Sequence, residues 1–170
     1  HLDYAYEPCM KVMSHMLTYD WLWNEVRGKG GAHGTGFVIN MNGNIGIDSY
    51  RDPDPMNLYR AALGASDYLI KAAESDMHLD QMIIGTIAAG EALLSPSSKV
   101  KVGDIMYFYH STYQMRKDAR MAMLTMKKSQ LKEYGEMLKK IIPACDICVI
   151  GSKDTIEGCK ELDLKPLKQL

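Results

Sequence analysis

The sequence predicts an α+β fold: a two-layer domain in which several helices cover one face of a small, mainly antiparallel sheet. Three observations lead to this prediction. Long stretches repeat apolar residues at helical spacing, one short segment has the composition of a β-hairpin, and neither a repeat nor a linker divides the chain. With 170 residues the chain is long enough to bury its own core, so residues 1–170 are expected to form a single domain.

The first expected element is a helix over residues 8–27, where apolar residues recur at roughly helical spacing. The glycine-rich segment GKGGAHGTG should end it, because glycine accepts the positive φ found after many helices. Residues 37–41 and 44–50 then predict two strands joined by a two-residue turn at Asn42-Gly43. Alternation in the second strand places Ile45 and Ile47 on one face.

The remainder of the chain is expected to be mainly helical. The segment RDPDP predicts a rigid turn, because each proline fixes its own φ and disfavours helix in the residue before it. The elements expected after this turn are helices at about 58–74 and 79–94, a loop over SPSSKVKVG, a helical stretch between 104 and 142 broken once near 125–129, a strand over 148–151 and a short helix over 153–162.

Charge and hydropathy argue against nucleic acid and membrane partners. Lys and Arg number 20 and Asp and Glu 21, so the net charge of −1 gives no electrostatic footprint for nucleic acid. The clustered basic residues have the spacing of a solvated helix face; they are Lys127, Lys128, Lys132, Lys139 and Lys140. No apolar run approaches the roughly 20 residues that span a bilayer.

The cysteines indicate free thiols. Cys145 and Cys148 form a C-x-x-C motif that leads into an expected strand, whereas a redox pair needs a helix N-terminus to lower a thiol pKa. A zinc site would need two more ligands nearby, and only the distant Cys9 and Cys159 remain. We therefore expect free thiols and no metal site at these cysteines, which favours a reducing intracellular compartment such as the cytoplasm.

The familiar catalytic motifs are absent from the sequence. Neither H-E-x-x-H, nor the inverted H-x-x-E-H, nor G-x-S-x-G occurs. The glycine-rich residues 28–31 lack the phosphate-loop pattern and follow a helix, whereas a phosphate loop follows a strand. These motifs therefore supply no candidate catalytic residue.

The most informative stretch is YDWLWNEVRGKGGAHG, residues 19–34. It places Arg27 near a helix end and His33 six residues later, beside backbone that glycine leaves open. A long cation and a polar ring in this setting suit the binding of an extended peptide. Two simpler interpretations remain open: Arg27 complements the helix dipole, and His33 is a loop histidine without a role.

The same residues carry a family resemblance. WLWNEVRGKGGAHG and SYRDP resemble segments from the C-terminal half of the insulinase (pitrilysin) family of zinc metallopeptidases, in its presequence-protease and falcilysin branch. The likeness continues through IIGTIAAGEALLSP to STYQMRKDARMAML, with Arg116 and Arg120 at similar spacing, and covers about residues 13–131. These motifs are long and ungapped, which makes the resemblance specific.

The resemblance implies a non-catalytic role. Family members have four similar domains that close around a peptide chamber, with zinc and the catalytic glutamate in the first; this chain is similar to the C-terminal (fourth) domain. Zinc is then expected in the N-terminal half of the parent protein, which would be the partner of this chain together with the peptide substrate. Arg27 and His33 match an arginine and a tyrosine that reach toward the bound peptide.

Histidine in place of tyrosine is a departure from the family pattern. A neutral imidazole can still donate a hydrogen bond to a developing oxyanion, but its ring is shorter than that of tyrosine. Either activity is retained with an altered pH profile, or this homologue is weakened. The alternative function is that of a catalytically inactive relative, which acts as a scaffold or binds a peptide or partner. An open sheet edge would also allow a homo-oligomer of the fragment.

Overall fold

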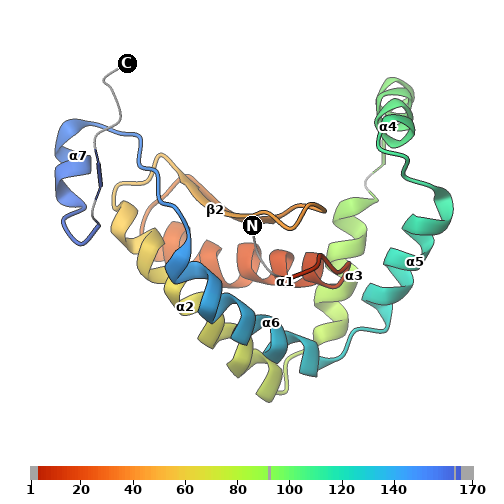
Figure 1. Cartoon of the computed structure of the whole chain (residues 1–170), viewed down its shortest axis with the longest axis horizontal. Coiled ribbons are helices and arrows are strands. Elements are labelled where there is room, and N and C mark those ends of the chain that lie inside the picture. Colours follow the sequence, from red (N-terminus) through yellow and green to blue (C-terminus); the bar gives the residue numbers. More distant parts are fainter. Residues whose placement is uncertain (1–3, 92, 163, 166–170) are drawn as a thin grey trace.

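The computed structural model describes residues 4–91, 93–162 and 164–165 and confirms the α+β prediction. An antiparallel hairpin lies on the inner side of a curved layer of helices (Figure 1). In order, the elements are α1 (Met10–Met16), the π-helix η1 (Leu17–Lys29), β1 (Gly34–Ile39), β2 (Ile45–Tyr50), α2 (Pro55–Glu74), α3 (Leu79–Gly90), α4 (Pro96–Phe108), α5 (Tyr113–Leu124), α6 (Lys128–Ile141), the 3₁₀ turn η2 (Ile142–Ala144) and α7 (Lys153–Gly158).

The first helix is present where it was expected, but it changes type along its length. The α-helix α1 continues directly into the 13-residue π-helix η1. π-helices are rare, usually extend over a single turn, and occur frequently at functional sites. Leu17, Leu22 and Val26 of η1 are fully buried, while Tyr19 and Trp23 are exposed. One face of η1 therefore builds the core and the other faces outward.

The hairpin differs from its prediction at the turn. The register pairs Gly34 with Tyr50 and Ile39 with Ile45, so both strands are shorter than expected at the turn end. The Asn40 amide donates to the Asn44 carbonyl, and Gly43, at φ +85°, donates to the Asn40 carbonyl; both bonds are 2.9 Å long. A two-residue type I′ turn needs positive φ at both central residues, and Asn42 does not have it. The prediction of a two-residue turn was therefore wrong, and the loop has three residues.

Hydroxyl groups on the first helix hold the hairpin in place. The carbonyl of Phe37 accepts hydrogen bonds from Ser14 Oγ at 2.6 Å and Thr18 Oγ1 at 3.2 Å. The amide of Phe37 donates to Thr18 Oγ1 at 2.9 Å. Both backbone groups of Phe37 thus point away from β2, and the helix covers the outer edge of β1. As predicted, Ile45 and Ile47 both pack toward the core.

The expected loop over SPSSKVKVG is a helix, and the prediction was wrong there. Ser95 caps α4 by accepting a hydrogen bond from the amide of Ser98 at 3.2 Å, and Pro96 occupies a first-turn position. A serine cap followed by proline is a common helix start, because proline lacks the N–H that would have no partner there. The helical stretch that follows is consequently broken twice, at 109–112 and at 125–127.

The final strand predicted over Cys148–Gly151 is also wrong. Residues 145–151 form an irregular segment between η2 and α7. A strand needs a partner for its backbone groups, and no residue in the described part of the chain pairs with this segment. The last helix, α7, is shorter than expected and ends at Gly158.

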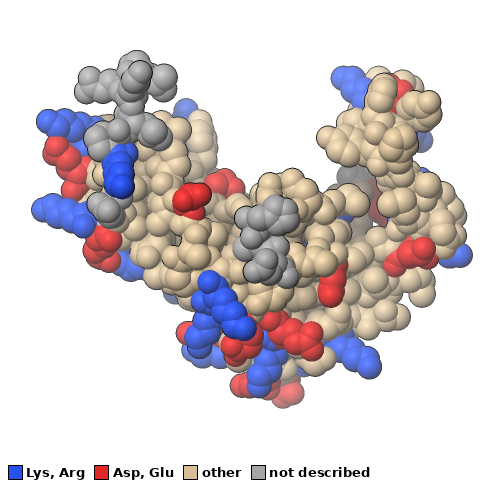
Figure 2. Space-filling model, in the orientation of Figure 1, with Lys and Arg blue, Asp and Glu red and all other residues tan. Residues whose placement is uncertain are grey.

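An arm formed by α4 and α5, residues 96–124, extends from one end of the helical layer (Figure 1). No residue of α4 is buried. Residues that are neither acidic nor basic cover most of the visible α4–α5 arm and of the hollow between it and the hairpin, with some charged residues at the tip of the arm (Figure 2). None of the described helices combines the length and the hydropathy needed to cross a membrane. The large exposed side chains of the arm are Val100, Ile105, Tyr107, Phe108, Tyr109, Tyr113, Met115, Met121 and Leu124.

The main helix contact packs α2 against α6. Both helices contribute buried residues to the core, among them Ala65 of α2 and Leu131 and Leu138 of α6. At Gly135 the helices approach so closely that an added Cβ would lie 2.7 Å from Ile70 Cγ1 and 2.9 Å from the Ser66 carbonyl oxygen. The close approach therefore requires glycine at this position.

Replacing Gly135 tests this contact. Gly135→Ala is expected to lower the free energy of unfolding by about 1–3 kcal/mol, because the added methyl group forces the two helices apart. Gly103→Ala in α4 is the matched control, since nothing lies within 4 Å of its Cβ position. That substitution should raise the stability by up to about 1 kcal/mol through helix propensity alone. Denaturant unfolding of both variants measures the difference; equal effects would contradict the packing account.

His15 packs at a second close helix contact. An added Cβ on Gly85 of α3 would lie 3.1 Å from His15 Nε2, and the His15 ring lies 4.7 Å from that of Tyr19. Burial lowers the pKa of His15 below its ordinary value, because the charged imidazolium loses hydration there. The folded state thus binds the His15 proton less readily than the unfolded state.

This difference predicts a pH effect on stability. Above about pH 6.5 His15 is neutral in both states and contributes no pH dependence. As the pH falls through 6.5 the unfolded state gains the proton first, so the free energy of unfolding should decrease. His15→Gln should remove this part of the decrease, measured by urea unfolding of both proteins between pH 7.5 and 5. A variant that loses as much stability as the wild type over this range would refute the assignment.

Candidate functional site

The loop from η1 to β1 forms the centre of the candidate site. Gly31 adopts φ +81°, and its amide donates to the Arg27 carbonyl at 3.1 Å. At Gly30 an added Cβ would lie 2.5 Å from the Val26 carbonyl oxygen and closer still to the side-chain amide of Asn57. Gly30 therefore allows the close approach of Asn57, and Gly31 supplies the left-handed turn.

Arg27 lies at the surface with its side chain fixed from two directions. Its guanidinium carbon lies 4.1 Å from the centroid of the Trp23 ring. Its Nε donates to the main-chain carbonyl of His33 at 3.3 Å. Among the ion pairs of the described residues, none involves Arg27. These two contacts use the face and the Nε of the guanidinium and neither of its terminal nitrogens.

The structure brings Arg27 and His33 together, as the sequence prediction requires. The main-chain amide of His33 donates to the Tyr50 carbonyl at 3.0 Å, which joins the glycine loop to the end of β2. The imidazole side chain is exposed. Residue 33 therefore positions Arg27 through its carbonyl while its own side chain is free to make other contacts.

Tyr19 and Trp23 also belong to this surface, and the sequence prediction missed them. His15, Tyr19, Trp23 and Arg27 follow one another at a spacing of four residues along the helix. The Tyr19 and Trp23 ring centroids are 6.3 Å apart, and Trp23 is 38% exposed. The i, i+4 spacing of aromatic residues ahead of Arg27 was the available signal, because such residues share a helix face. We call this series the aromatic row.

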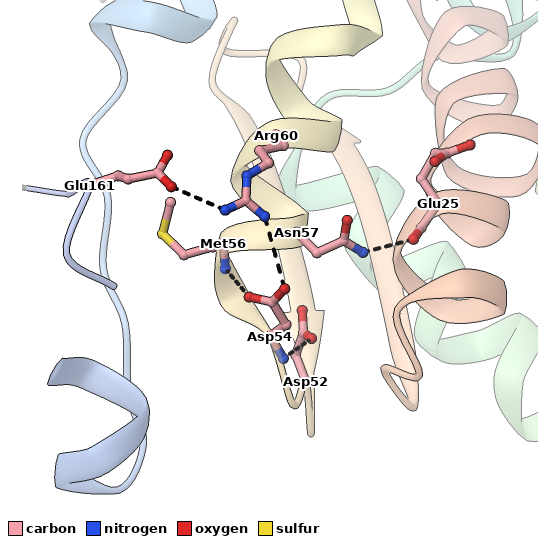
Figure 3. A network of polar contacts seen from close by, with 7 residues as sticks. All are labelled: Glu25, Asp52, Asp54, Met56, Asn57, Arg60 and Glu161. Carbon is pink, nitrogen blue, oxygen red and sulfur yellow. Dashed lines mark hydrogen bonds and ion pairs between the residues drawn. The ribbon is translucent and has the colours of Figure 1, made fainter. Parts of the chain in front are cut away.

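The turn RDPDP connects β2 to α2, and Figure 3 shows the polar contacts of its aspartates. It lies beside the glycine loop, because an added Cβ on Gly31 would be 3.7 Å from Pro53 Cγ. Asp52 Oδ1 accepts a hydrogen bond from the Asp54 amide at 3.0 Å, and Asp54 caps α2 through the Met56 amide at 3.1 Å. Arg60 binds Glu161 at 3.1 Å and approaches Asp54 at 4.0 Å. These bonds support the interpretation of the segment as a structural corner.

A link between α2 and η1 starts at the same corner. The Asn57 side chain donates to the Glu25 carbonyl at 2.8 Å, as Figure 3 shows. Glu25 lies in the last turn of η1, where carbonyl groups lack helical partners. The helix end that carries Arg27 is thereby attached to the first turn of α2.

The cysteines and acidic residues do not gather into a metal-binding group in the described part of the chain. No group of three or more His, Cys, Asp or Glu residues there could hold a metal ion. Cys145 and Cys148 are free and exposed, and burial together with Asp146 raises the pKa of the Cys145 thiol. A raised thiol pKa opposes the redox interpretation of the C-x-x-C motif.

Known proteins similar to this chain include presequence proteases and a protein named without an activity. The family model of the PreP C-terminal domain matches residues 2–153. Protein HypA of Clostridium perfringens is 28% identical over 159 residues, which are 94% of this chain and 16% of that protein.

Mitochondrial presequence proteases from two fungi extend the comparison. The protein of Gibberella zeae is 30% identical over 128 residues, 75% of this chain and 12% of that protein. The protein of Aspergillus oryzae is 25% identical over 145 residues, 85% of this chain and 14% of that protein. The chain thus spans 16% or less of the length of these relatives. Because the family model covers most of the sequence, the chain belongs to the PreP C-terminal domain family, a C-terminal domain associated with proteases.

Proposed function

We propose that this chain is the substrate-contacting, non-catalytic C-terminal domain of a zinc metalloendopeptidase. The observation that carries the proposal is the arrangement of Arg27, which stacks on Trp23 and binds the His33 carbonyl through Nε alone. Membership of the PreP C-terminal domain family supplies the protease context. In this proposal zinc and the catalytic glutamate belong to the N-terminal half of the parent protein.

The chemistry of Arg27 suits an extended peptide. A guanidinium has five N–H donors in a fixed fork, and the Nε–His33 bond uses one of them. The remaining donors can bind carbonyl oxygens of a peptide without any change in protonation. Because Trp23 already orders the Arg27 side chain, Arg27 loses less conformational entropy when a peptide binds.

His33 supports a second contact to the same peptide. Its exposed imidazole can donate a hydrogen bond to a peptide carbonyl or to an oxyanion that develops from it. The aromatic row adds apolar surface beside this position, with Tyr19 and Trp23 both exposed. Side-chain donors that bind the peptide backbone, together with apolar surface, suit peptides of varied sequence.

The α4–α5 arm supports the proposal that the domain closes a chamber with another part of the protein. Tyr107, Phe108 and Tyr109 are more than three-quarters exposed. Contiguous apolar surface of this kind marks protein–protein contacts in soluble proteins. We propose that the arm packs against the N-terminal half when the chamber closes around the peptide.

The second candidate is a domain of a catalytically inactive relative that binds a peptide or partner. The observation that favours it is histidine at position 33, where the resembling branch has tyrosine. The two candidates separate on the sequence of the parent gene. An H-x-x-E-H motif with a downstream glutamate in its N-terminal half supports the peptidase, and absence of this motif excludes it.

Substitution of Arg27 in the full-length protein tests the proposed contact. Arg27→Ala is expected to lower kcat/KM for an unstructured peptide by about 10- to 100-fold, the effect of losing charge-assisted hydrogen bonds. Arg27→Lys should restore only part of the activity, because an ammonium lacks the planar fork. Zinc content and melting temperature should not change in either variant.

A neighbouring cation provides the matched control. Lys29 is exposed and pairs with Glu25 across one helix turn at 2.6 Å, so Lys29→Ala should leave kcat/KM within about twofold. If Arg27→Ala behaves like Lys29→Ala, Arg27 serves only to complement the helix end and the proposed substrate contact is wrong.

The proposal that catalysis belongs to another domain gives a separate prediction. The 170-residue chain alone should not hydrolyse peptides even when zinc is added, because its described residues offer no metal site. Release of fluorescence from a quenched peptide substrate measures this. Hydrolysis that follows the chain through purification and stops with chelator would overturn the assignment of catalysis to another domain.

A further inference from the structure

Arg51, the residue that follows β2, has an unfavourable backbone conformation. It adopts φ +48°. Residues other than glycine, asparagine and aspartate rarely occupy this left-handed region. A turn alone would favour glycine or asparagine at this point. The arginine is therefore expected to contribute through its side chain, since such residues cluster where proteins contact their ligands.

His110 illustrates a structural reason for the same conformation, and that reason does not apply to Arg51. At φ +51°, His110 is the only other non-glycine residue with positive φ in the part of the chain that the structure describes. It lies just beyond the end of α4, and the amide of Ser111 after it donates to the Met106 carbonyl at 2.8 Å. This hydrogen bond ends many helices and requires a left-handed residue. Arg51 follows a strand and has no such role.

The Arg51 side chain takes no part in the polar contacts of the corner. Asp52, Asp54 and Arg60 supply those contacts (Figure 3). The guanidinium carbon of Arg51 lies 5.3 Å from the centroid of the Tyr50 ring, within the range of a cation–π contact. Arg51 is exposed, and none of the ion pairs among the described residues involves it. Its N–H donors can therefore reach a ligand.

One backbone junction connects Arg51 to Arg27. The His33 carbonyl accepts from Arg27 Nε at 3.3 Å, and the His33 amide donates to the carbonyl of Tyr50, the residue before Arg51, at 3.0 Å. Each guanidinium also lies over an exposed aromatic ring, that of Trp23 or that of Tyr50. A peptide in an extended conformation advances roughly 3.3 Å per residue, so several residues of one peptide can span the junction.

The charges around Arg51 select the group that it binds. Asp48, Asp52 and Asp146 line the same cavity, which has a volume of about 570 Å³. These carboxylates repel an acidic side chain, whereas they do not repel a neutral carbonyl oxygen. A guanidinium can bind carbonyl oxygens through its fixed fork of N–H donors. Arg51 therefore suits the main chain of a peptide better than a carboxylate.

We infer that Arg51 is a second substrate-contacting residue, which binds main-chain carbonyl oxygens of the same peptide several residues away from Arg27. The inference rests on the proposed function, because it requires that Arg27 contacts this peptide. Arg51 contributes to binding and does not touch the bond that is cleaved. Its contribution therefore depends on the length of the peptide and not on the peptide side chains.

The length dependence is tested in the full-length protein. Arg51→Asn removes the cation, and asparagine accepts the left-handed backbone, so the melting temperature should stay the same or rise. KM for a quenched fluorogenic peptide of fourteen residues should increase about tenfold with kcat unchanged, because the lost contact holds substrate and transition state equally. Of two peptides that keep the cleavage site but are shortened from opposite ends, one should show no effect. Arg27→Ala should impair cleavage of all three peptides.

Peptide composition distinguishes a main-chain contact from a carboxylate contact. Versions of the long peptide with glutamate, glutamine or lysine away from the cleavage site should show the same increase in KM on Arg51→Asn. Arg51→Lys should restore only part of the affinity, because an ammonium lacks the planar fork. Arg60→Gln is the matched control: it removes a cation from the same corner and should leave KM within about twofold for every peptide.

Four results with Arg51→Asn would overturn the inference. They are an unchanged KM for the long peptide, an equal increase in KM for the long and both shortened peptides, an increase confined to the glutamate version, and a lower melting temperature, which would assign Arg51 to the fold of the corner. If Arg27→Ala still impairs cleavage in these cases, the Arg51 contact alone is wrong. If Arg27→Ala has no effect, the proposed function is wrong and the inference fails with it.

Discussion

The attachment of the end of η1 to the start of α2 determines the geometry of the whole candidate site. Asn57 donates to the Glu25 carbonyl at 2.8 Å, and Gly30 approaches the same side chain so closely that no Cβ fits there. This contact sets where the helix ends and therefore where Arg27 lies. The glycine loop follows from that point, and the His33 amide then joins the loop to Tyr50 at the end of β2. The Asn57 contact thus sets the relative positions of η1, α2 and the end of β2.

The two outer edges of the hairpin differ in how the rest of the chain covers them. Ser14 and Thr18 satisfy the outward backbone groups of Phe37, so the edge of β1 is closed within the chain. Beside β2 the chain leaves a groove and a segment with strand composition that forms no ladder. Hydroxyl groups can take the place of a neighbouring strand where a helix lies close, as Ser14 and Thr18 do at the β1 edge.

The sequence predicted the helical layer, the hairpin and the positions of Arg27 and His33, because each depends on local patterns. Apolar periodicity marks η1 and α2, and glycine marks the end of η1. The sequence prediction failed where the structure of a segment depends on a partner that is distant in the sequence. Residues 148–151 have the composition of a strand, but a strand forms only when a neighbouring strand is present. The helix at α4 was missed for another reason, since its start signal, Ser95-Pro96, resembles a turn and its face is not amphipathic. The π-helical type of η1 was also missed, because apolar periodicity alone does not distinguish it from an α-helix.

The role of residue 33 explains how histidine can stand where the resembling branch has tyrosine. Its carbonyl accepts from Arg27 and its amide donates to Tyr50, and both groups are present in any residue except proline. The position of the loop therefore does not depend on the side chain, which is exposed and contributes little to folding. A substitution here changes what is presented to a peptide and leaves the placement of Arg27 intact. The two halves of the proposed contact are thus separable: the backbone of residue 33 orients the arginine, while its side chain can vary with the substrate.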